Sequence, residues 1–479
     1  MEESADAVTE KKRRFPKSIP FILILSLLER VSSIGSSSIL LLYMYQKLHF
    51  DESTSTALFH TNDFLIYFSP IVGAIVAESY FGIFKTLVAG TLLFLTGISI
   101  VAVGSIGVLN LPAIPLTIFG LFISIFGVGC LRGNLSAFGG NQFKLPEDSK
   151  NLQLFFSVQF MFFNGGALLS RIFSPILRQD VKCFGSDDCY PVAFGMTLVT
   201  MSLGFLTIYA GKRHYVHRPV TDNVFMKVCG CVLYSLRMKL LRMSKEQKSH
   251  WLDYADTKYD QKLIEDTKKL FRILKVFIPI PIFWSVFMQQ NSRWVFQAAR
   301  MDGDIGFYTI KPDQMIAVNP ISSILLSPFC SKYLYPFLIR IKIGGMFARI
   351  NIGKFLCFIA FCIAIYVETV IQEHRISVLW LVPQWIILAL SENILYVALM
   401  NFAYSEGPVN MKAVLTGCVY TTMAIGNLLV TLISGAKLFS SQVYEFMFFN
   451  VMLLIAMGVF SLLANDFKKS QKKIPETVL

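Results

Sequence analysis

The stretch Ser18–Tyr45 reads SIPFILILSLLERVSSIGSSSILLLYMY and determines which kind of fold this chain adopts. A helix of about 20 apolar residues crosses the hydrocarbon core of a bilayer, and this stretch is long enough to do so. Glu29 and Arg30 nevertheless lie near its middle, where a charged side chain costs about 3 kcal/mol on insertion scales. Residues of this kind usually face the interior of a helix bundle. The stretch therefore predicts a membrane-spanning helix with one polar face.

Three further apolar runs contain charged or titratable residues. His60 and Asp63 lie in TALFHTNDFLIYFSPIVGAIVA, Arg132 in LFISIFGVGCLRGNLSAF, and Glu392 in LVPQWIILALSENILYVALM. One such group can belong to an ion pair that locks two helices together. Basic, acidic and imidazole groups in four separate spans fit a pathway for a solute and protons better.

The composition is that of an integral membrane protein. Hydrophobic residues make up 54%, charged residues only 16%, and the mean hydropathy is +0.56, a balance that a soluble domain does not have. Helices are the structure that satisfies the backbone of long apolar runs inside a bilayer. Twelve such segments are predicted, with cores at residues 19–45, 55–77, 83–107, 112–136, 153–177, 190–210, 272–296, 315–338, 346–370, 377–402, 412–434 and 443–465.

The net charge of +13 is explained by the positive-inside rule rather than by a nucleic-acid partner. Lysine and arginine gather in the N-terminal tail (1–18), a central segment (212–270) and the C-terminal tail (466–479). An even number of spans puts all three on one side, which we expect to be the cytosol. The central segment predicts an amphipathic helix on the inner leaflet, and a calmodulin or partner-protein site is the alternative.

The central segment also divides the chain into two bundles of six predicted helices, residues 19–211 and 271–465. Two six-helix halves around a site near the bilayer midplane are the arrangement of a major-facilitator transporter, which works by alternating access. The expected fold is therefore an all-α, polytopic membrane protein of this class.

The cysteines and other reactive residues give no sign of an enzyme. Cys183 and Cys189 fall in an outward loop between the fifth and sixth spans, where a disulfide can form and persist. No Cys/His spacing resembles a metal site, and no nucleophile or phosphate-binding loop stands out. We therefore expect no catalytic residues, no metal and no cofactor, with protons as the coupling ion.

Several long motifs resemble one transporter family, in the same order and spacing. They include GVGCLRGNLSAFGGNQF (Gly127–Phe143), FFSVQFMFFNGGALLSRIFSPILRQ (Phe155–Gln179) and IPIPIFWSVFMQQNSRWVFQ (Ile278–Gln297). The chain is similar in these motifs to the proton-coupled oligopeptide transporters, and most to their animal branch. The resemblance extends from the first span to about residue 430 and implies proton-driven uptake of short peptides.

The resemblance assigns proton coupling to the first two spans. The family's Glu-x-x-Glu-Arg motif corresponds to SLLER at 26–30, so Glu29 and Arg30 are retained while the first acid is Ser26. His60 matches the histidine linked to protonation in animal members. Tyr67 matches a tyrosine of the substrate pocket on the same helix.

The resemblance also implies a set of substrate-binding residues. Arg132 stands where the family has a lysine in the fourth span, and Asn164, Trp284 and Glu392 match positions that line the peptide site. Glu392 is expected to hold the amino group of the peptide. Arg132 would supply the opposite charge for the carboxylate, and Asn164 can donate to and accept from an amide.

Two charges that pair across the halves in microbial members are both neutral here. The first-span arginine is Ser37 and the seventh-span acid is Met288. Losing one partner of a buried pair costs about 3–5 kcal/mol, whereas losing both is tolerated. The paired loss indicates a changed gate, and an inactive member of the family is the alternative.

Asp63 is the acid expected to complete the proton path. It lies three residues after His60, which is helical spacing. An aspartate near an imidazole favours the imidazolium. The alternative is that Asp63 sits near the outer end of its span and is solvated.

The function predicted from these observations is proton-coupled symport of short peptides or peptide-like solutes. Alternatives are transport of another small solute, such as histidine or a modified amino acid, uncoupled facilitation, and a non-transporting receptor or scaffold. A multi-pass protein with both termini cytosolic is expected, in the plasma membrane rather than an endolysosomal one. The ending Glu476-Thr477-Val478-Leu479 has the form that adds as a strand to PDZ domains, with coincidence as the alternative.

Overall fold

The computed structural model describes residues 15–144, 147–217, 224–241, 248, 250–408 and 411–472. Apart from isolated β-bridges, every regular element within these residues is a helix. Ten of the described helices are long and apolar enough to cross a membrane, or 11 when the bent pair Gln261–Phe277 and Ile280–Ala299 counts as one span. The predicted all-helical membrane fold is confirmed.

The first bundle consists of consecutive helices joined by short loops. The Asp51 side chain caps the second of them by accepting from the backbone N–H of Thr54, and a π-helical turn, η1, continues that helix to Phe81. The bundle contains α1 (Ile19–Gln46), α2 (Glu52–Val76), η1 (Ala77–Phe81), α3 (Ile83–Gly104), α4 (Ala113–Gly140), α5 (Ser149–Gln179) and α6 (Tyr190–Ala210).

One span of the second bundle is interrupted near a proline, which removes a backbone donor. The seventh bends by 49° between α8 and α9, near Pro279. The eighth predicted segment is helical throughout, but no single helix in it is long enough to span a membrane. The bundle contains α8 (Gln261–Phe277), α9 (Ile280–Met288), η5 (Gln289–Asn291), α10 (Arg293–Ala299), η6 (Pro312–Ala317), α11 (Val318–Phe329), η7 (Cys330–Leu334), α12 (Tyr335–Arg340), α13 (Met346–Glu373), α14 (Val382–Glu406), α15 (Lys412–Gly435) and α16 (Gln442–Lys472).

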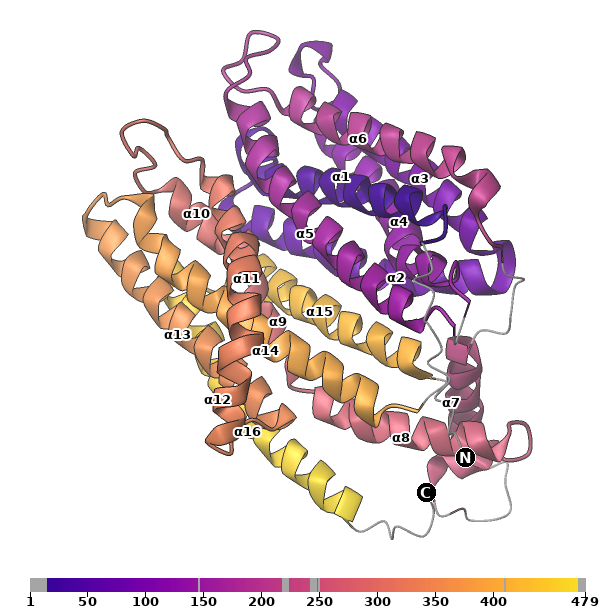
Figure 1. Ribbon diagram of the computed structural model, residues 1–479. Helices are drawn as coiled ribbons and strands as arrows, with labels where there is room; N and C mark the ends of the chain where they lie inside the picture. The colour runs from indigo at the N-terminus through magenta and orange to yellow at the C-terminus, as the bar shows by residue number, and fades with distance from the viewer. Residues whose placement is uncertain are drawn as a thin grey trace, which may run out of the picture.

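The two bundles lie side by side, with α1–α6 on one side and α9–α16 on the other (Figure 1). Helices α2 and α15 pack directly against each other along the interface. One apolar core fills the first bundle around Phe94, Leu131 and Phe155. A larger core lies around Trp294, Phe361 and Leu395 of the second bundle and continues across the interface to first-bundle residues such as Ile39 and Phe59. The two bundles therefore share apolar contacts, and the polar side chains between them come from both halves.

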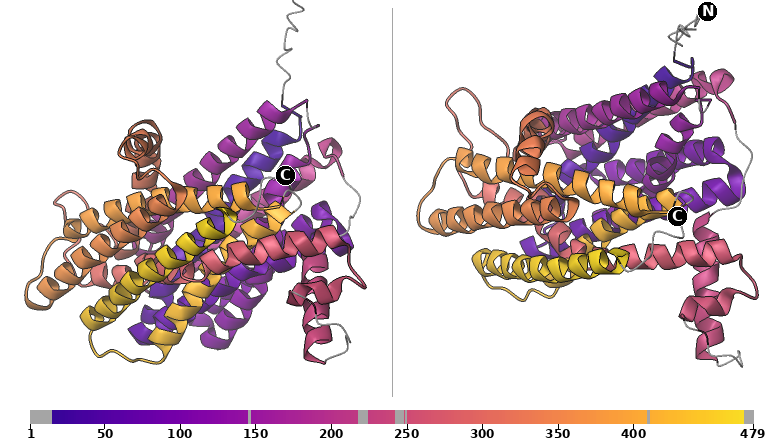
Figure 2. Two further views of the ribbon diagram at one scale, coloured as in Figure 1. Left: turned by 90° about the horizontal axis from the view of Figure 1, so that it is seen from below. Right: turned by 60° about the horizontal axis from the view of Figure 1, so that its bottom comes forward.

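The central segment forms a small helical unit at one end of the molecule, which we call the linker end (Figure 2). Here α7 (Val224–Leu240) packs on η4 (Trp251–Ala255) and α8 through a buried cluster of Cys231, Leu252, Ala255 and Ile264. The expectation of a single amphipathic helix is therefore wrong, because this cluster folds the segment back on itself.

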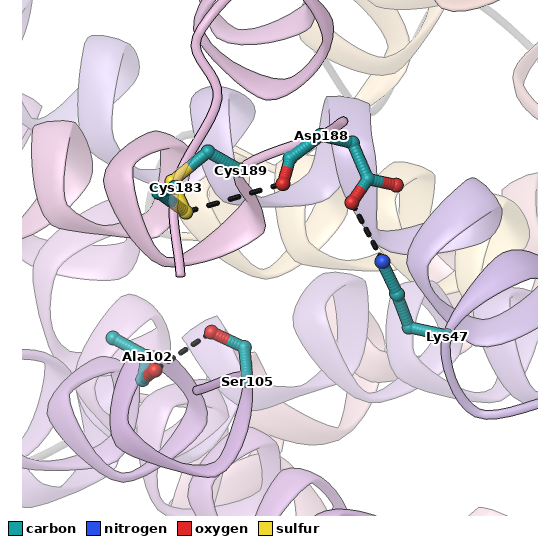
Figure 3. The surroundings of a disulfide bond; sticks show 6 residues. All are labelled: Lys47, Ala102, Ser105, Cys183, Asp188 and Cys189. Atoms are coloured by element: carbon teal, nitrogen blue, oxygen red, sulfur yellow. Dashed lines mark hydrogen bonds and ion pairs between the residues drawn. A yellow bond between two sulfur atoms is a disulfide. The ribbon is translucent and has the colours of Figure 1, made fainter. Parts of the chain in front are cut away.

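The opposite end, which we call the disulfide end, carries the loop between α5 and α6. Cys183 and Cys189 are bonded there with an S–S distance of 2.01 Å. The neighbouring Asp188 pairs with Lys47 at the end of α1, with 2.6 Å between Nζ and Oδ1 (Figure 3). The loop is thus fixed both to itself and to α1.

Gly166 lets α5 approach α1 at the level of the charged residues. A Cβ at this position would lie 2.8 Å from the carbonyl oxygen of Leu27 and 2.8 Å from the Cβ of Arg30. We expect Gly166→Ala to destabilise the purified protein by about 1–3 kcal/mol, as overpacking does, measured by thermal unfolding. Gly165→Ala is the matched control, since a Cβ there meets nothing within 4 Å. Equal stability of the two variants would contradict this close approach.

Candidate functional site

A buried carboxylate on α1 brings together two arginines. Glu29 pairs with Arg30 at 3.4 Å and with Arg132 of α4 at 3.3 Å, measured between Nε and the carboxylate oxygens. The Ser33 hydroxyl donates to Glu29 at 3.0 Å and accepts from Arg132 at 3.1 Å. Three predicted residues therefore form one ion cluster that joins α1 to α4. The Arg132 guanidinium is already engaged within it.

A cavity between the bundles lies next to this cluster. Asp63 and Tyr67 of α2 line it together with Arg132, and the second bundle contributes Asn291 and Ile316. Asp63 is only 7% exposed and interacts electrostatically with Arg132 and with Arg171 of α5. Asp63 is thus buried beside cavity-lining cations rather than wetted at a helix end.

Arg171 is a cavity residue that the sequence analysis missed. It lines the same cavity as Ser37, the position at which the family resemblance places an arginine. It interacts electrostatically with Asp63 and, across the interface, with Glu392 of α14. The sequence contained a sign of its role, because Arg171 lies in the predicted span 153–177. A charged residue within a span indicates a functional site, as it does for Arg132. Arg171 and Glu392 place opposite charges on opposite bundles.

His60 connects the two bundles instead of pairing with Asp63. Its Nδ1 lies 2.7 Å from Asn427 Oδ1 of α15, and its Nε2 lies 2.8 Å from Ser292 Oγ. The imidazole is fully buried. Both contacts persist whether the ring is neutral or charged, because the serine hydroxyl can donate or accept. The predicted neighbour relationship with Asp63 rested on helix spacing alone, which does not reveal partners from the other half.

The other three predicted substrate residues, Asn164, Trp284 and Glu392, are not among the residues that line this cavity. Asn164 donates to the Phe160 carbonyl oxygen of its own helix at 2.9 Å. Trp284 is 1% exposed and packs in an aromatic cluster with Phe287 and Tyr396. In this conformation the Trp284 ring belongs to the packed interior of the second bundle.

Ion pairs join the bundles at the disulfide end. Arg178 of α5 makes a bidentate contact with Asp313 of η6, at 3.1 Å for both Nε and Nη2. Both side chains are buried. Further pairs across the same boundary are Lys311–Asp180, Lys437–Asp51 and Arg300–Glu52. The disulfide end is therefore closed between the bundles.

No group of three or more metal-ligating side chains occurs among the residues that the structure describes. The charged groups at the interface are partnered with each other or line the cavity. Their arrangement suits a solute that carries both a positive and a negative charge.

Comparisons with known proteins place these features in one family. A family model described as the POT family matches residues 84–458. Peptide transporter family 1 of Drosophila melanogaster is 36% identical over 371 residues, which cover 78% of this chain and 50% of that protein. Solute carrier family 15 member 2 of Danio rerio is 37% identical over 360 residues, which cover 74% of this chain and 50% of that protein. The chain thus spans about half the length of the curated relatives it matches.

Solved structures show the same fold. The in meso crystal structure of the POT family transporter PepTSo aligns with a TM-score of 0.81 at 20% identity, over 95% of this chain and 99% of that one. An auto-inhibited POT family peptide transporter aligns with a TM-score of 0.80 at 21% identity, over 94% and 97% of the two chains.

Proposed function

The chain belongs to the POT family, and on that premise we propose that it is a proton-coupled symporter of short peptides or peptide-like solutes. The observation that carries the proposal is the pair of opposite charges on opposite bundles, Arg171 and Glu392. A zwitterionic solute between them would satisfy both groups and draw the bundles together. The relatives named above are transporters, and no enzymatic activity is proposed.

The substrate carboxylate is assigned to Arg171 because Arg132 is engaged with Glu29 and Ser33. Arg171 has a planar fork of donors that matches a carboxylate. Glu392 would take the substrate amine, which offsets the desolvation of its own charge. Ser37 lines the same cavity as Arg171, and its short side chain leaves Arg171 without a second arginine at that position.

Coupling is assigned to His60, because its hydrogen bonds cross the interface. A proton on the imidazole adds positive charge to a buried contact next to Arg293, which follows Ser292 in the chain. Charging this contact should weaken closure of the disulfide end, and closing it should expel the proton. Glu29 and Asp63 are further carboxylates on the path from His60 into the cavity.

Asp51 serves as an internal control for the pH dependence. Lys437 Nζ donates to Oδ1 of Asp51 at 2.9 Å, and the Thr54 hydroxyl donates to the same oxygen at 2.6 Å. Together these two donors hold the pKa of Asp51 well below its usual range. Since the folded-state pKa is lower than the unfolded value of about 3.9, this stabilisation is present above that value and is lost only as the pH falls below it. The Asp51 carboxylate therefore stays charged between pH 5 and 8.

The pH profile of transport should accordingly depend on His60 and not on Asp51. We expect His60→Gln to abolish the response of uptake to an inward proton gradient while counterflow exchange continues, because the neutral amide keeps both hydrogen bonds. Asp51→Asn should leave the profile in place, since this half-exposed pair contributes at most about 1 kcal/mol. An unchanged gradient response in His60→Gln would remove the histidine from the coupling mechanism.

The direct test of the function is uptake into proteoliposomes at two external pH values, with a panel of dipeptides and free amino acids. Dipeptide uptake that rises with external acidity supports the proposal. Uptake of amino acids alone would favour another solute. Absence of both uptake and ligand-induced thermal stabilisation would favour a receptor or scaffold.

We also propose the placement of the chain in the cell. Basic residues near the linker end favour a cytosolic position for that end, with the disulfide end outside. The plasma membrane is the proposed location, and a PDZ-domain protein is the proposed partner of Thr477–Leu479. These last residues lie outside the part of the chain that the structure describes.

A further inference from the structure

A second cavity lies at the linker end of the first bundle, and the proposed transport mechanism does not use it. Its volume is about 1000 Å³, at the upper end of the range of about 300–1,000 Å³ for small-molecule sites. Its walls come from η1, the start of α3, and the ends of α4 and α6, and it shares no lining residue with the interface cavity. We call it the linker-end groove.

One wall of the groove is held rigidly by the loop after α6. Gln142 at the end of α4 accepts from the Val216 N–H at 2.8 Å and donates to its carbonyl oxygen at 3.2 Å. The Tyr215 ring packs 4.9 Å from Phe138, and the His217 ring lies 5.2 Å from Phe84, measured between centroids. The groove is therefore formed before any ligand enters.

The groove is amphipathic. Val88 and Leu92 line its apolar part, and Leu92 is 48% exposed. Its polar part carries Lys85, Lys212 and His217 against one acid, Glu78. Lysine side chains near the membrane surface are attracted to an anionic leaflet. The lining thus favours a molecule with apolar chains and a negative head.

The groove lies at the ends of the membrane spans, at the depth expected for lipid headgroups. Helix α3 begins at Ile83 and α6 ends at Ala210, so Lys85 and Lys212 lie at the ends of membrane spans, where cationic side chains meet lipid phosphates. Val88 and Leu92 lie one and two turns deeper along α3, where acyl chains lie.

We propose that the linker-end groove binds one anionic phospholipid, with its phosphate between Lys85 and Lys212 and an acyl chain against Val88 and Leu92. This site is independent of the substrate site. An occupying lipid would join the ends of α3, α4 and α6 and stabilise the first bundle.

The test is native mass spectrometry of the intact, detergent-purified chain with phosphatidylserine and with phosphatidylcholine of the same acyl chains. We expect one phosphatidylserine to bind at least tenfold more tightly than phosphatidylcholine. The double variant Lys85→Gln/Lys212→Gln should lose about tenfold or more of that affinity. Equal binding of the two lipids by the parent protein would overturn the proposal.

A matched control separates the groove from general surface charge. Lys332 is exposed on η7 of the second bundle and lies 5.4 Å from the Tyr333 ring, much as Lys212 lies 5.9 Å from Tyr209. Lys332→Gln should leave phosphatidylserine binding unchanged, and an equal loss there would overturn the proposal.

The apolar part of the site is tested by filling it. Ala89 lines the groove and is exposed, so Ala89→Trp should displace both lipids without disturbing the core. Val199→Trp, on the exposed face of α6, is its control and should bind lipid as the parent does. Undiminished phosphatidylserine binding by Ala89→Trp would show that the lipid lies elsewhere.

Discussion

Glu392→Gln is expected to abolish uptake of substrates that have a free amino group, while expression and folding stay close to those of the parent. Glu392 is half-buried on α14 and its electrostatic partner Arg171 belongs to the other bundle. A charge-assisted hydrogen bond to an ammonium contributes about 1.5–3 kcal/mol, so binding should weaken by about 10- to 150-fold. Closure around the substrate should fail as well, because the amide no longer attracts the amine.

The measurement is uptake of matched dipeptides with free and N-acetylated amino groups. The parent should prefer the peptide with a free amino group. The variant should lose this preference and take up both peptides equally poorly. Glu373→Gln, at the exposed end of α13, is the control and should behave as the parent. Normal uptake of the free peptide by Glu392→Gln would remove this residue from the substrate site.

Arg171 should show the complementary selectivity. In Arg171→Gln we expect the KM for peptides with a free carboxylate to rise at least tenfold, while C-terminally amidated peptides are unaffected. Arg132→Gln should instead disturb proton coupling, because it breaks the cluster with Glu29. If amidated and free peptides lose affinity equally in Arg171→Gln, the arginine acts on structure and not on the carboxylate.

The spans and the polar stripe on α1 could be predicted from sequence because both depend on local pattern. Charge inside an apolar run identified Glu29, Asp63 and Arg132, and the structure places all three around one cluster and cavity. The same rule would have identified Arg171. The family resemblance pointed instead to position 37, where this chain has a serine.

The contacts of His60 could not be predicted, because they depend on how the two bundles meet. Asn427 and Ser292 are ordinary polar residues in their own segments, and only docking of α2 against the second bundle brings them to the imidazole. Trp284 shows that a match to a family motif does not predict where a side chain points. Its position in the motif resembles that of a site residue, yet helix rotation turns its ring into the core in this state.

Breaking the pair between Arg178 and Asp313 is expected to open the disulfide end. Both side chains are nearly inaccessible to solvent, so Asp313→Asn leaves a guanidinium buried without its carboxylate, at a cost of about 3–5 kcal/mol. Since about 1.4 kcal/mol changes an equilibrium tenfold, the closed state should lose a factor of about 100 or more relative to the open one. Closure on this side is a required step of alternating access, and transport should fall with it.

The readout is labelling of a cysteine introduced at Ser37, which lines the interface cavity, with a membrane-impermeant thiol reagent added from the disulfide end. The background lacks the free cysteines but keeps Cys183 and Cys189. Asp313→Asn should be labelled much faster than the parent. Lys437→Met is the control, because it breaks a half-exposed pair across the same boundary and should change labelling by no more than about fivefold.

A second variant keeps this prediction testable if Asp313→Asn folds poorly. Replacing both partners, as in Arg178→Leu/Asp313→Leu, removes the buried charges together, and such exchanges are often neutral or stabilising. The double variant should therefore be closed again and label as slowly as the parent. The double variant should also transport poorly. Asp313→Asn fails to close the disulfide end, whereas the apolar contact of the double variant should open less readily and admit less substrate. Slow labelling of both Asp313→Asn and the double variant would show that the pair does not hold this end closed.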